Sequence, residues 1–311
     1  MSSYAHLPPY RVEFPAMAFS SGEGVDWGLT AYGVPALWKE YHGEGVTVAV
    51  VDSGIAKHPA LDGRVKEYRN FSADAVVEDT LGHGTHVAGV IAADKGPCKG
   101  IAPSAKLVSC KVLGHSGTGS NTAVSEAVEY AVESKVDIIS MSLGSESADQ
   151  RLHAAIKSAV AAGIIVVCAA GNDGGDVNYP AAFPETIAVG AVDRSGNACP
   201  FSCRGASISV AAPGQDITST WLNGGYATLT GTSMAAPFVA GTLALYVSAA
   251  KHRGGKVSHS EVMKALAETA TDAGNPGKDD LYGWGLLNPG KLLTYAPMSG
   301  VTIFIPGARV V

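Results

Sequence analysis

The chain has 311 residues, enough for one large α/β domain or two ordinary domains with a sizeable buried core. Hydrophobic residues make up 46% of it, charged residues 16%, and 38 residues are glycine, which excludes a disordered or coiled-coil chain. The formal net charge of -6 argues against a nucleic-acid partner.

Two features bear on the compartment. Residues 1–19 contain no basic stretch followed by an apolar core, and no apolar run approaches membrane-spanning length, so we expect a soluble, cytoplasmic protein with no membrane partner. The five cysteines are an odd number at irregular positions, and buried free thiols explain them best. Cys199 and Cys203 leave a disulfide or a metal site open, but two cysteines without further ligands nearby are weak evidence.

The order of apolar runs and turn residues predicts the fold class. Residues 1–25 are rich in Pro, Ser and Gly, and the prolines favour an extended conformation. Apolar runs bounded by turn residues predict buried strands at 46–51, 107–112, 138–141, 164–169 and 187–192. Helical periodicity predicts helices at 84–93, 122–133, 151–162, 232–250 and 258–269, the last with a capping box. Near-continuous Val and Ile runs indicate an α/β fold with a mostly parallel central sheet and helices on both faces.

In such a sheet the reactive residues belong at the carboxyl ends of the strands. Three polar residues stand there: Asp52 directly after the first predicted strand, His83 between two glycines at a helix start, and Asn172 after the strand 164–169. Taken singly, each is as well explained as a turn or helix-start residue. All three residues are expected at the same edge of the sheet, so they are candidates for one site.

Ser233 lies at the start of the longest predicted helix. A helix start leaves backbone N–H groups without partners and carries the positive end of the helix dipole, so negative charge that forms beside this serine is stabilised. Small neighbours let a second backbone approach, and we expect Pro237 to be tolerated because it falls in the first turn. A serine before an apolar run is most often only a helix cap, so this stretch alone does not establish catalysis.

Together these residues supply the parts that acyl transfer needs: a hydroxyl nucleophile, a base, a carboxylate that orients the base, and a donor for the oxyanion. The segments 51–54, 83–89 and 231–237 resemble the three signatures of the subtilisin family of serine proteases. The resemblance extends over roughly residues 30 to 290 and implies the three-layer subtilisin-like fold.

The resemblance implies a role for each candidate. Asp52 orients His83, which acts as general base and then general acid, and Ser233 attacks the peptide carbonyl. The Asn172 side chain and the Ser233 N–H hold the oxyanion, with Thr232 as a weaker donor. This makes the chain a serine endopeptidase that works through an acyl-enzyme intermediate on polypeptide substrates and needs no organic cofactor.

The resemblance also implies a substrate cleft between two walls that pair with an extended backbone. Leu143 and Leu152 line the pocket for the fourth residue before the cut, with Asn121 and Val124 at its rim. Small residues line the pocket for the residue before the cut, so specificity is broad, and Asp173 tolerates basic side chains. The walls are Gly117, Thr118, Gly119, Ser142, Leu143 and Gly144, and the second pocket is Ala169, Ala170, Gly171, Asp173 and Asn178.

Within the family, the segments 135–144 and 166–172 look most similar to the intracellular subtilisins. Those enzymes carry a short N-terminal extension with a Leu-Ile-Pro-Tyr motif, and the matching residues here are Leu7, Pro8, Pro9 and Tyr10. We expect this segment to bind across the cleft as an inhibitor, with Pro8 or Pro9 holding the scissile carbonyl away from Ser233. The alternative is a terminus with no such role.

Calcium is the one metal that the resemblance raises. The loop at residues 93–98 is shorter than the calcium loop of secreted relatives and carries a lysine, so we expect no calcium there. A second structural site built on Asp193 and backbone carbonyls near Asn178 stays open.

The chain is expected to comprise an extension (residues 1–25), a peptidase domain (26–295) and a tail (296–311) with a strand-like run at 302–305. Two other functions compete with an active intracellular protease: a secreted protease of the same family, and a catalytically silent peptide-binding relative. The intact chemical positions disfavour the silent relative. A homodimer is left open.

Overall fold

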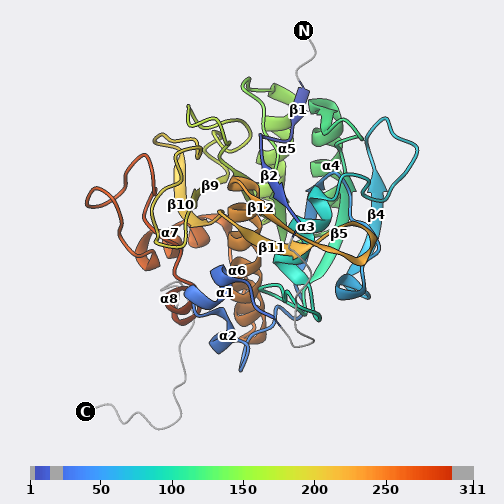
Figure 1. Ribbon diagram of the computed structural model, residues 1–311. Helices are drawn as coiled ribbons and strands as arrows, with labels where there is room; N and C mark the ends of the chain where they lie inside the picture. The colour runs from blue at the N-terminus through green and yellow to red at the C-terminus, as the bar shows by residue number, and fades with distance from the viewer. Residues whose placement is uncertain (1–3, 15–23, 296–311) are drawn as a thin grey trace, which may run out of the picture.

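The computed structural model describes residues 4–14 and 24–295 (Figure 1). The expected tail, with its run at 302–305, lies outside the described residues, as do parts of the N-terminal extension. The centre is a seven-stranded sheet, parallel throughout, in the order β10-β9-β8-β7-β3-β5-β4. Its strands are β3 (Thr47–Asp52), β4 (Val65–Asn70), β5 (Lys106–Lys111), β7 (Ile138–Met141), β8 (Ile165–Ala169), β9 (Ile187–Val192) and β10 (Ile208–Pro213).

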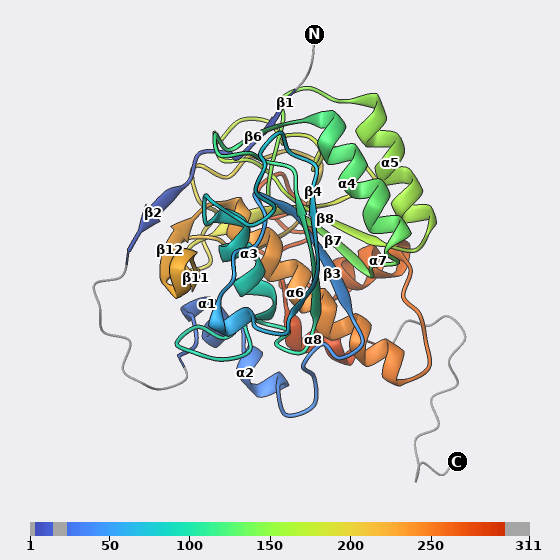
Figure 2. The same ribbon diagram turned by 90° about the vertical axis from the view of Figure 1, so that its right-hand side faces the viewer.

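Helices cover both faces of this sheet, as predicted. Successive side chains of a strand point to opposite faces, so Val48 and Val50 of β3 join one buried cluster and Ala49 and Val51 join the other. The first cluster packs under α3 and α6, the second under α4 and α5, and Figure 2 shows these helix pairs on either side of the strands. The three-layer α/β fold is therefore confirmed. The helices are α1 (Trp27–Ala31), α2 (Val34–Leu37), α3 (His83–Ala92), α4 (Asn121–Glu133), α5 (Gln150–Ala161), α6 (Thr232–His252), α7 (His259–Thr269) and α8 (Pro289–Thr294), with short 3-10 turns at Pro59–Leu61 and Leu222–Gly224.

All five predicted strands and all five predicted helices are present, and α7 has the expected capping box between Ser258 and Glu261. Two strands of the sheet were not predicted. β4 is an edge strand with alternating exposure, and its polar side chains hide it among loops. β10 is fully buried, but Ser209 and Pro213 interrupt the apolar pattern that marks the other buried strands.

Two small sheets were not predicted either, and both contain part of the N-terminal extension. β1 (Tyr4–His6) pairs antiparallel with β6 (Thr118–Ser120). β2 (Arg11–Glu13) pairs antiparallel with β12 (Tyr226–Thr230), which also pairs with β11 (Ile217–Thr220). Figure 1 shows this extension crossing the molecule from β1 to β2.

The structure bears on two expectations, one about the cysteines and one about the length of apolar segments. All five cysteines are free and buried, as predicted. The expectation that no apolar segment approaches membrane-spanning length was wrong, because α6 is long and apolar enough by length and composition. The whole of its most apolar window is buried inside the protein, so α6 is the central core helix.

Candidate active site

Asp52 is the last residue of β3 and His83 the first residue of α3, and their side chains meet beyond the carboxyl end of the strand. The His83 ring nitrogen Nδ1 lies 2.8 Å from Asp52 Oδ1 and 3.0 Å from Oδ2. Because a carboxylate only accepts, this contact assigns the proton to Nδ1 and leaves Nε2 free to act as a base. Both side chains are 0% exposed.

The backbone around Asp52 is fixed by short contacts. The Ser53 N–H donates to Asp52 Oδ1 at 2.7 Å, and the Ser53 hydroxyl oxygen accepts from Gly84 N–H at 2.9 Å. A Cβ atom on Gly84 would lie 2.1 Å from the Gly54 carbonyl oxygen, so only glycine allows α3 to approach β3 this closely. The buried Lys111 ammonium donates to the Ser53 carbonyl at 3.0 Å.

A second buried carboxylate, Asp79, joins this turn to the start of α3. Its Oδ1 accepts from the Ser53 hydroxyl at 2.9 Å and from the N–H groups of Leu81 and Gly82 at 2.9 and 3.0 Å. Its Oδ2 accepts from the N–H and hydroxyl of Thr85 at 2.9 and 2.7 Å. No sequence pattern singles out this residue, because a carboxylate four residues before a helix is usually a turn former. It positions the Asp52 turn relative to the helix.

Ser233 is the second residue of α6. Pro237 lies inside this helix and beyond its first turn, which corrects the prediction. Since proline has no N–H, the Ser233 carbonyl lacks its usual partner four residues on. The Ser142 hydroxyl supplies the replacement and donates to the Ser233 carbonyl at 3.0 Å. The proline therefore frees a carbonyl that anchors the serine to the predicted cleft wall.

Asn172 is oriented by Thr232. The Thr232 N–H and hydroxyl both donate to Asn172 Oδ1, at 2.8 and 2.7 Å. This turns the amide nitrogen outward, where it donates to the Pro9 carbonyl oxygen at 2.8 Å. The prediction that Thr232 is itself a weak oxyanion donor needs correction, because its hydroxyl faces Asn172. The Pro9 carbonyl thus lies at the oxyanion donor, and the expectation that a proline holds the scissile carbonyl away from Ser233 stays a prediction.

The N-terminal segment runs between the two predicted walls. β1 pairs with β6, which contains Thr118 and Gly119, and Leu7 N–H donates to the Gly117 carbonyl at 3.0 Å. On the other wall, His6 and Gly144 exchange both backbone hydrogen bonds, at 2.9 and 3.0 Å. The segment thus forms the middle strand between the walls, as β-strand addition predicts.

Tyr10 closes the site over the imidazole. Its ring centre lies 4.9 Å from that of His83, and burial raises the pKa of the tyrosine, helped by the nearby Asp52 and Asp79. His83 Nε2 is buried without a hydrogen-bond partner among the described residues. The Ser233 hydroxyl instead donates to the Ser142 carbonyl at 3.4 Å. The nucleophile is therefore not hydrogen-bonded to the base in this state.

The apolar pocket predicted at Leu143 and Leu152 is filled. Ala5, which is 1% exposed, belongs to the same buried cluster as both leucines and Val124. Asn121 is buried too, at 2% exposure. The segment therefore fills with a small side chain the pocket that the resemblance assigns to the fourth residue before the cut, although Ala5 is the fifth residue counted back from the Pro9 carbonyl that Asn172 holds.

The second predicted pocket contains a cysteine that sequence reasoning missed. Cys203 donates its thiol to Asp173 at 2.8 Å, which lowers the pKa of that carboxyl, and accepts from the Asn178 amide at 3.7 Å. A Cβ on Gly171 would lie 2.1 Å from the Asn178 amide nitrogen, so glycine is required at that wall. Asn178 also donates its N–H to the Ala170 carbonyl. The predicted residues Ala169, Ala170, Gly171, Asp173 and Asn178 therefore lie around Cys203, which separates Asp173 from the apolar core.

The residues considered for calcium fit the ion poorly. Asp193 uses its carboxylate within its own turn, where it accepts from the N–H groups of Ser195 and Asn197 and from the Asn197 amide. In the loop at 93–98, Asp94 is paired with Arg64 at 3.6 Å. Among residues 4–14 and 24–295 no group of three or more His, Cys, Asp or Glu side chains could hold a metal.

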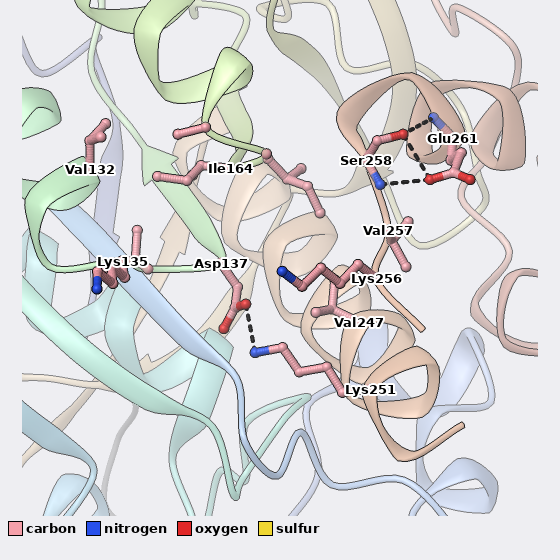
Figure 3. A pocket seen from close by; sticks show the side chains of 14 residues that line it. Val132, Lys135, Asp137, Ile164, Val247, Lys251, Lys256, Val257, Ser258 and Glu261 are labelled. Carbon is pink, nitrogen blue, oxygen red and sulfur yellow. Dashed lines mark hydrogen bonds and ion pairs between the residues drawn. The ribbon is translucent and has the colours of Figure 1, made fainter. Parts of the chain in front are cut away.

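A cavity of about 590 Å³ lies away from these residues, beside the amino ends of β7 and β8 (Figure 3). Figure 3 shows Lys251 pointing at Asp137, with which it pairs at 2.6 Å, while Val247 and Ile164 form apolar walls. None of the predicted site residues lines this cavity. Reactive groups of parallel sheets lie at the opposite, carboxyl edge, where Asp52, His83 and Asn172 converge.

Fold and site together define a three-layer α/β protein with a buried carboxylate–imidazole pair and a helix-start serine, the parts of a serine hydrolase. The model of the subtilase family matches residues 43–285, so the chain belongs to that family and is a subtilisin-like serine protease. It is 43% identical over 259 residues to an intracellular serine protease of Paenibacillus polymyxa, covering 79% of this chain and 78% of that one. It is 40% identical over 271 residues to Subtilisin Savinase of Lederbergia lenta, covering 86% and 97%, and 39% identical over 282 residues to M-protease of Shouchella clausii (strain KSM-K16), covering 89% and 72%.

A fluorophosphonate is expected to label Ser233 in protein freed of its N-terminal segment, because the helix start stabilises negative charge that forms beside this hydroxyl. Ser233→Ala and His83→Ala should each lower turnover about 10⁶-fold, a magnitude known from the subtilisin triad rather than obtained from this structure. Peptide mapping of the labelled protein is the measurement. Labelling at another residue would show that the nucleophile has been misassigned.

Asp79→Asn is expected to lower kcat at least tenfold while KM changes less than about twofold, since it moves the base and not the cleft walls. An amide leaves at least one of five buried donors unpaired, which costs about 1–3 kcal/mol in the free energy of unfolding. Steady-state kinetics and thermal unfolding test this. The matched control is Asp62→Asn, at an exposed aspartate. A variant with normal kcat and lowered stability would leave Asp79 a structural role only.

Calcium is expected to stabilise the protein only modestly, because Arg64 and Lys95 bring positive charge to the loop at 93–98. A site that binds only the folded state and is saturated about 100-fold would add about 2.7 kcal/mol. Thermal melts with calcium and with chelator measure the difference. A fall of tens of degrees in chelator would show a strong site.

Proposed function

We propose that this chain is a cytoplasmic serine endopeptidase of broad specificity whose N-terminal extension (residues 1–25) is autoinhibitory, with residues 4–14 in its own cleft. The observation that carries the proposal is the hydrogen bond from the Asn172 amide to the Pro9 carbonyl. This donor is oriented by two hydrogen bonds from Thr232, and it holds a carbonyl of the protein's own chain where a substrate carbonyl is expected.

The contacts support one sequence of steps once the segment has left. Ser233 Oγ attacks the substrate carbonyl carbon while His83 Nε2 takes its proton, and Asp52 stabilises the imidazolium through Nδ1–H. The negative charge moves to the carbonyl oxygen, where the Asn172 amide and the Ser233 N–H donate. His83 then protonates the leaving amine, and a water molecule activated by His83 hydrolyses the acyl-enzyme.

Pro8 explains how the segment binds in the manner of a substrate without being cut. His6 and Gly144 form a hydrogen-bonded antiparallel pair. If this register continues, the next such pair, two residues along each strand, would be Pro8 opposite Ser142. Pro8 has no N–H to donate, so the Ser142 carbonyl accepts from the Ser233 hydroxyl instead. That contact turns the nucleophile away from His83.

Three observations support the finer statements of the proposal. The relative from Paenibacillus polymyxa is an intracellular serine protease, and the five cysteines here are free. Other relatives are subtilisins and alkaline proteases, so cell fractionation is the test of location. Broad specificity is supported by the small residues Ala169, Ala170 and Gly171 around the second pocket.

A chain that begins at Phe19 is expected to be at least tenfold more active on a peptide substrate than the full chain. β1 and β2 belong to the small sheets, and their loss leaves the seven-stranded sheet intact. The peptide Ser2–Glu13 added in trans should inhibit the shortened enzyme competitively. Initial rates against peptide concentration measure this.

The matched pair of peptides carries Pro8→Ala or Pro9→Ala. Only the first restores the missing donor opposite Ser142, so it should be cut much faster than the second, as mass spectrometry of the products would show. Equal activity of the full and shortened chains would remove the inhibitory role. Cleavage by the shortened chain that disappears in Ser233→Ala would still establish the protease.

A further inference from the structure

The strand β2 continues the N-terminal segment beyond Tyr10, on the side where the leaving half of a substrate would lie. It pairs antiparallel with β12 through Arg11 opposite Thr230, Val12 opposite Leu229 and Glu13 opposite Thr228. Since Pro9 presents its carbonyl to Asn172, residues 10–14 correspond to the first five residues after a cut. The cleft therefore contacts an extended chain well past the reacting carbonyl.

Side chains of this strand alternate between the protein and solvent. Tyr10 and Val12 pack against the main core cluster, while Arg11 and Glu13 pair with each other at the surface. The alternation places Phe14 on the same face as Tyr10 and Val12. The first, third and fifth positions after Pro9 are thus the ones that contact the protein.

Trp221 is the contact for the fifth position. The Phe14 ring lies edge-on to it, with ring centres 6.2 Å apart and planes at 74°. The indole also packs on the backbone that leads into α3, since a Cβ on Gly82 would lie 2.5 Å from it, and its ring centre is 6.4 Å from that of His86. The tryptophan is thereby held in place before any ligand arrives, and Phe14 itself is 68% exposed.

Removal of the segment would turn β12 into an edge strand. In the three-stranded sheet β12 lies between β11 and β2, so without β2 it becomes an edge with unpaired N–H and C=O groups. Such an edge accepts an extended peptide by main-chain hydrogen bonding. The end of this edge is next to Trp221, which follows β11 and precedes β12 in the chain.

We propose that β12 and Trp221 form a leaving-side substrate site that selects polypeptides with apolar side chains at the first, third and fifth positions after the cut, the fifth preferably aromatic. This rests on the proposed function, because it requires that the segment marks the path of a substrate. The occupant is the extended leaving half of a polypeptide. Trp221 then determines specificity, although nearly the whole length of β12 separates it from the reacting atoms.

The test compares two peptides that share every residue except the fifth after the cut, which is Phe in one and Ala in the other. With the chain that begins at Phe19, kcat/KM should favour the Phe peptide about threefold to tenfold, the range expected for an aromatic pair. Trp221→Ala should bring the ratio to about one. Trp221→Leu, which retains apolar packing on Gly82, should also lose most of the preference and guards against a variant that does not fold.

Trp284→Ala is the matched control, since this tryptophan is 37% exposed and pairs with Lys278 instead. It should retain the full preference. A ratio of one in the unsubstituted enzyme, or a preference that survives Trp221→Ala, would overturn the site. Either result leaves the proposed protease intact, provided that both peptides are cut and Ser233→Ala cuts neither.

A second test of the proposed site measures inhibition. The peptide Ser2–Phe14 should inhibit with an inhibition constant about threefold to tenfold lower than its Phe14→Ala form, while Tyr4→Ala, at another exposed aromatic residue of the segment, should have less effect. If Phe14→Ala weakens inhibition but substrates show no preference, the contact serves the inhibitory segment alone and the substrate site is refuted.

Discussion

The hydrogen bond between Asp52 and His83 is the interaction on which the rest of the site depends. Both side chains are inaccessible to solvent, and a buried carboxylate is costly unless it is paired and hydrogen-bonded. The protein meets this cost with the Ser53 N–H at the strand end and the His83 ring N–H at the helix start, both of which donate to Asp52. Because such donors converge only at the carboxyl edge of a parallel sheet, the seven-stranded sheet is what makes the pair stable.

The same arrangement creates a second constraint, which concerns the nucleophile. The Ser233 hydroxyl could donate to either of two acceptors, the His83 imidazole or the Ser142 carbonyl. Here it donates to the carbonyl. An incoming N–H from a substrate would compete for that carbonyl and release the hydroxyl toward the base. Substrate pairing with the wall would in this way free the nucleophile for its base, and in the proposed inhibitory binding Pro8 has no N–H with which to do so.

Much of the fold and of the site was predictable from sequence, because the signals for strands, helix caps and strand-end residues are local. Apolar runs identified five strands, the capping box identified α7, and the residues after strand ends identified Asp52 and Asn172. Asp79 was missed because four of its five donors are local, as for an ordinary turn residue before a helix, and only the fold brings the fifth, the Ser53 hydroxyl, to it. The orientation of Thr232 and the exchange between Pro237 and Ser142 were missed for the same reason, since hydrogen-bond partners distant in sequence leave no local pattern.

The two halves of the cleft differ in how firmly they hold a chain. Before the reacting carbonyl, the segment is bound between two walls, with hydrogen bonds to Gly117 on one and Gly144 on the other. After it, only β12 pairs with the chain, so side-chain contacts must supply more of the binding there. Loose binding of the leaving half favours product release, because the amine product is held by one edge and a few apolar contacts. A single rigid aromatic side chain such as Trp221 then adds selectivity, because it has little conformational entropy to lose when a substrate binds. It does so without a second wall, which would slow the departure of the amine product.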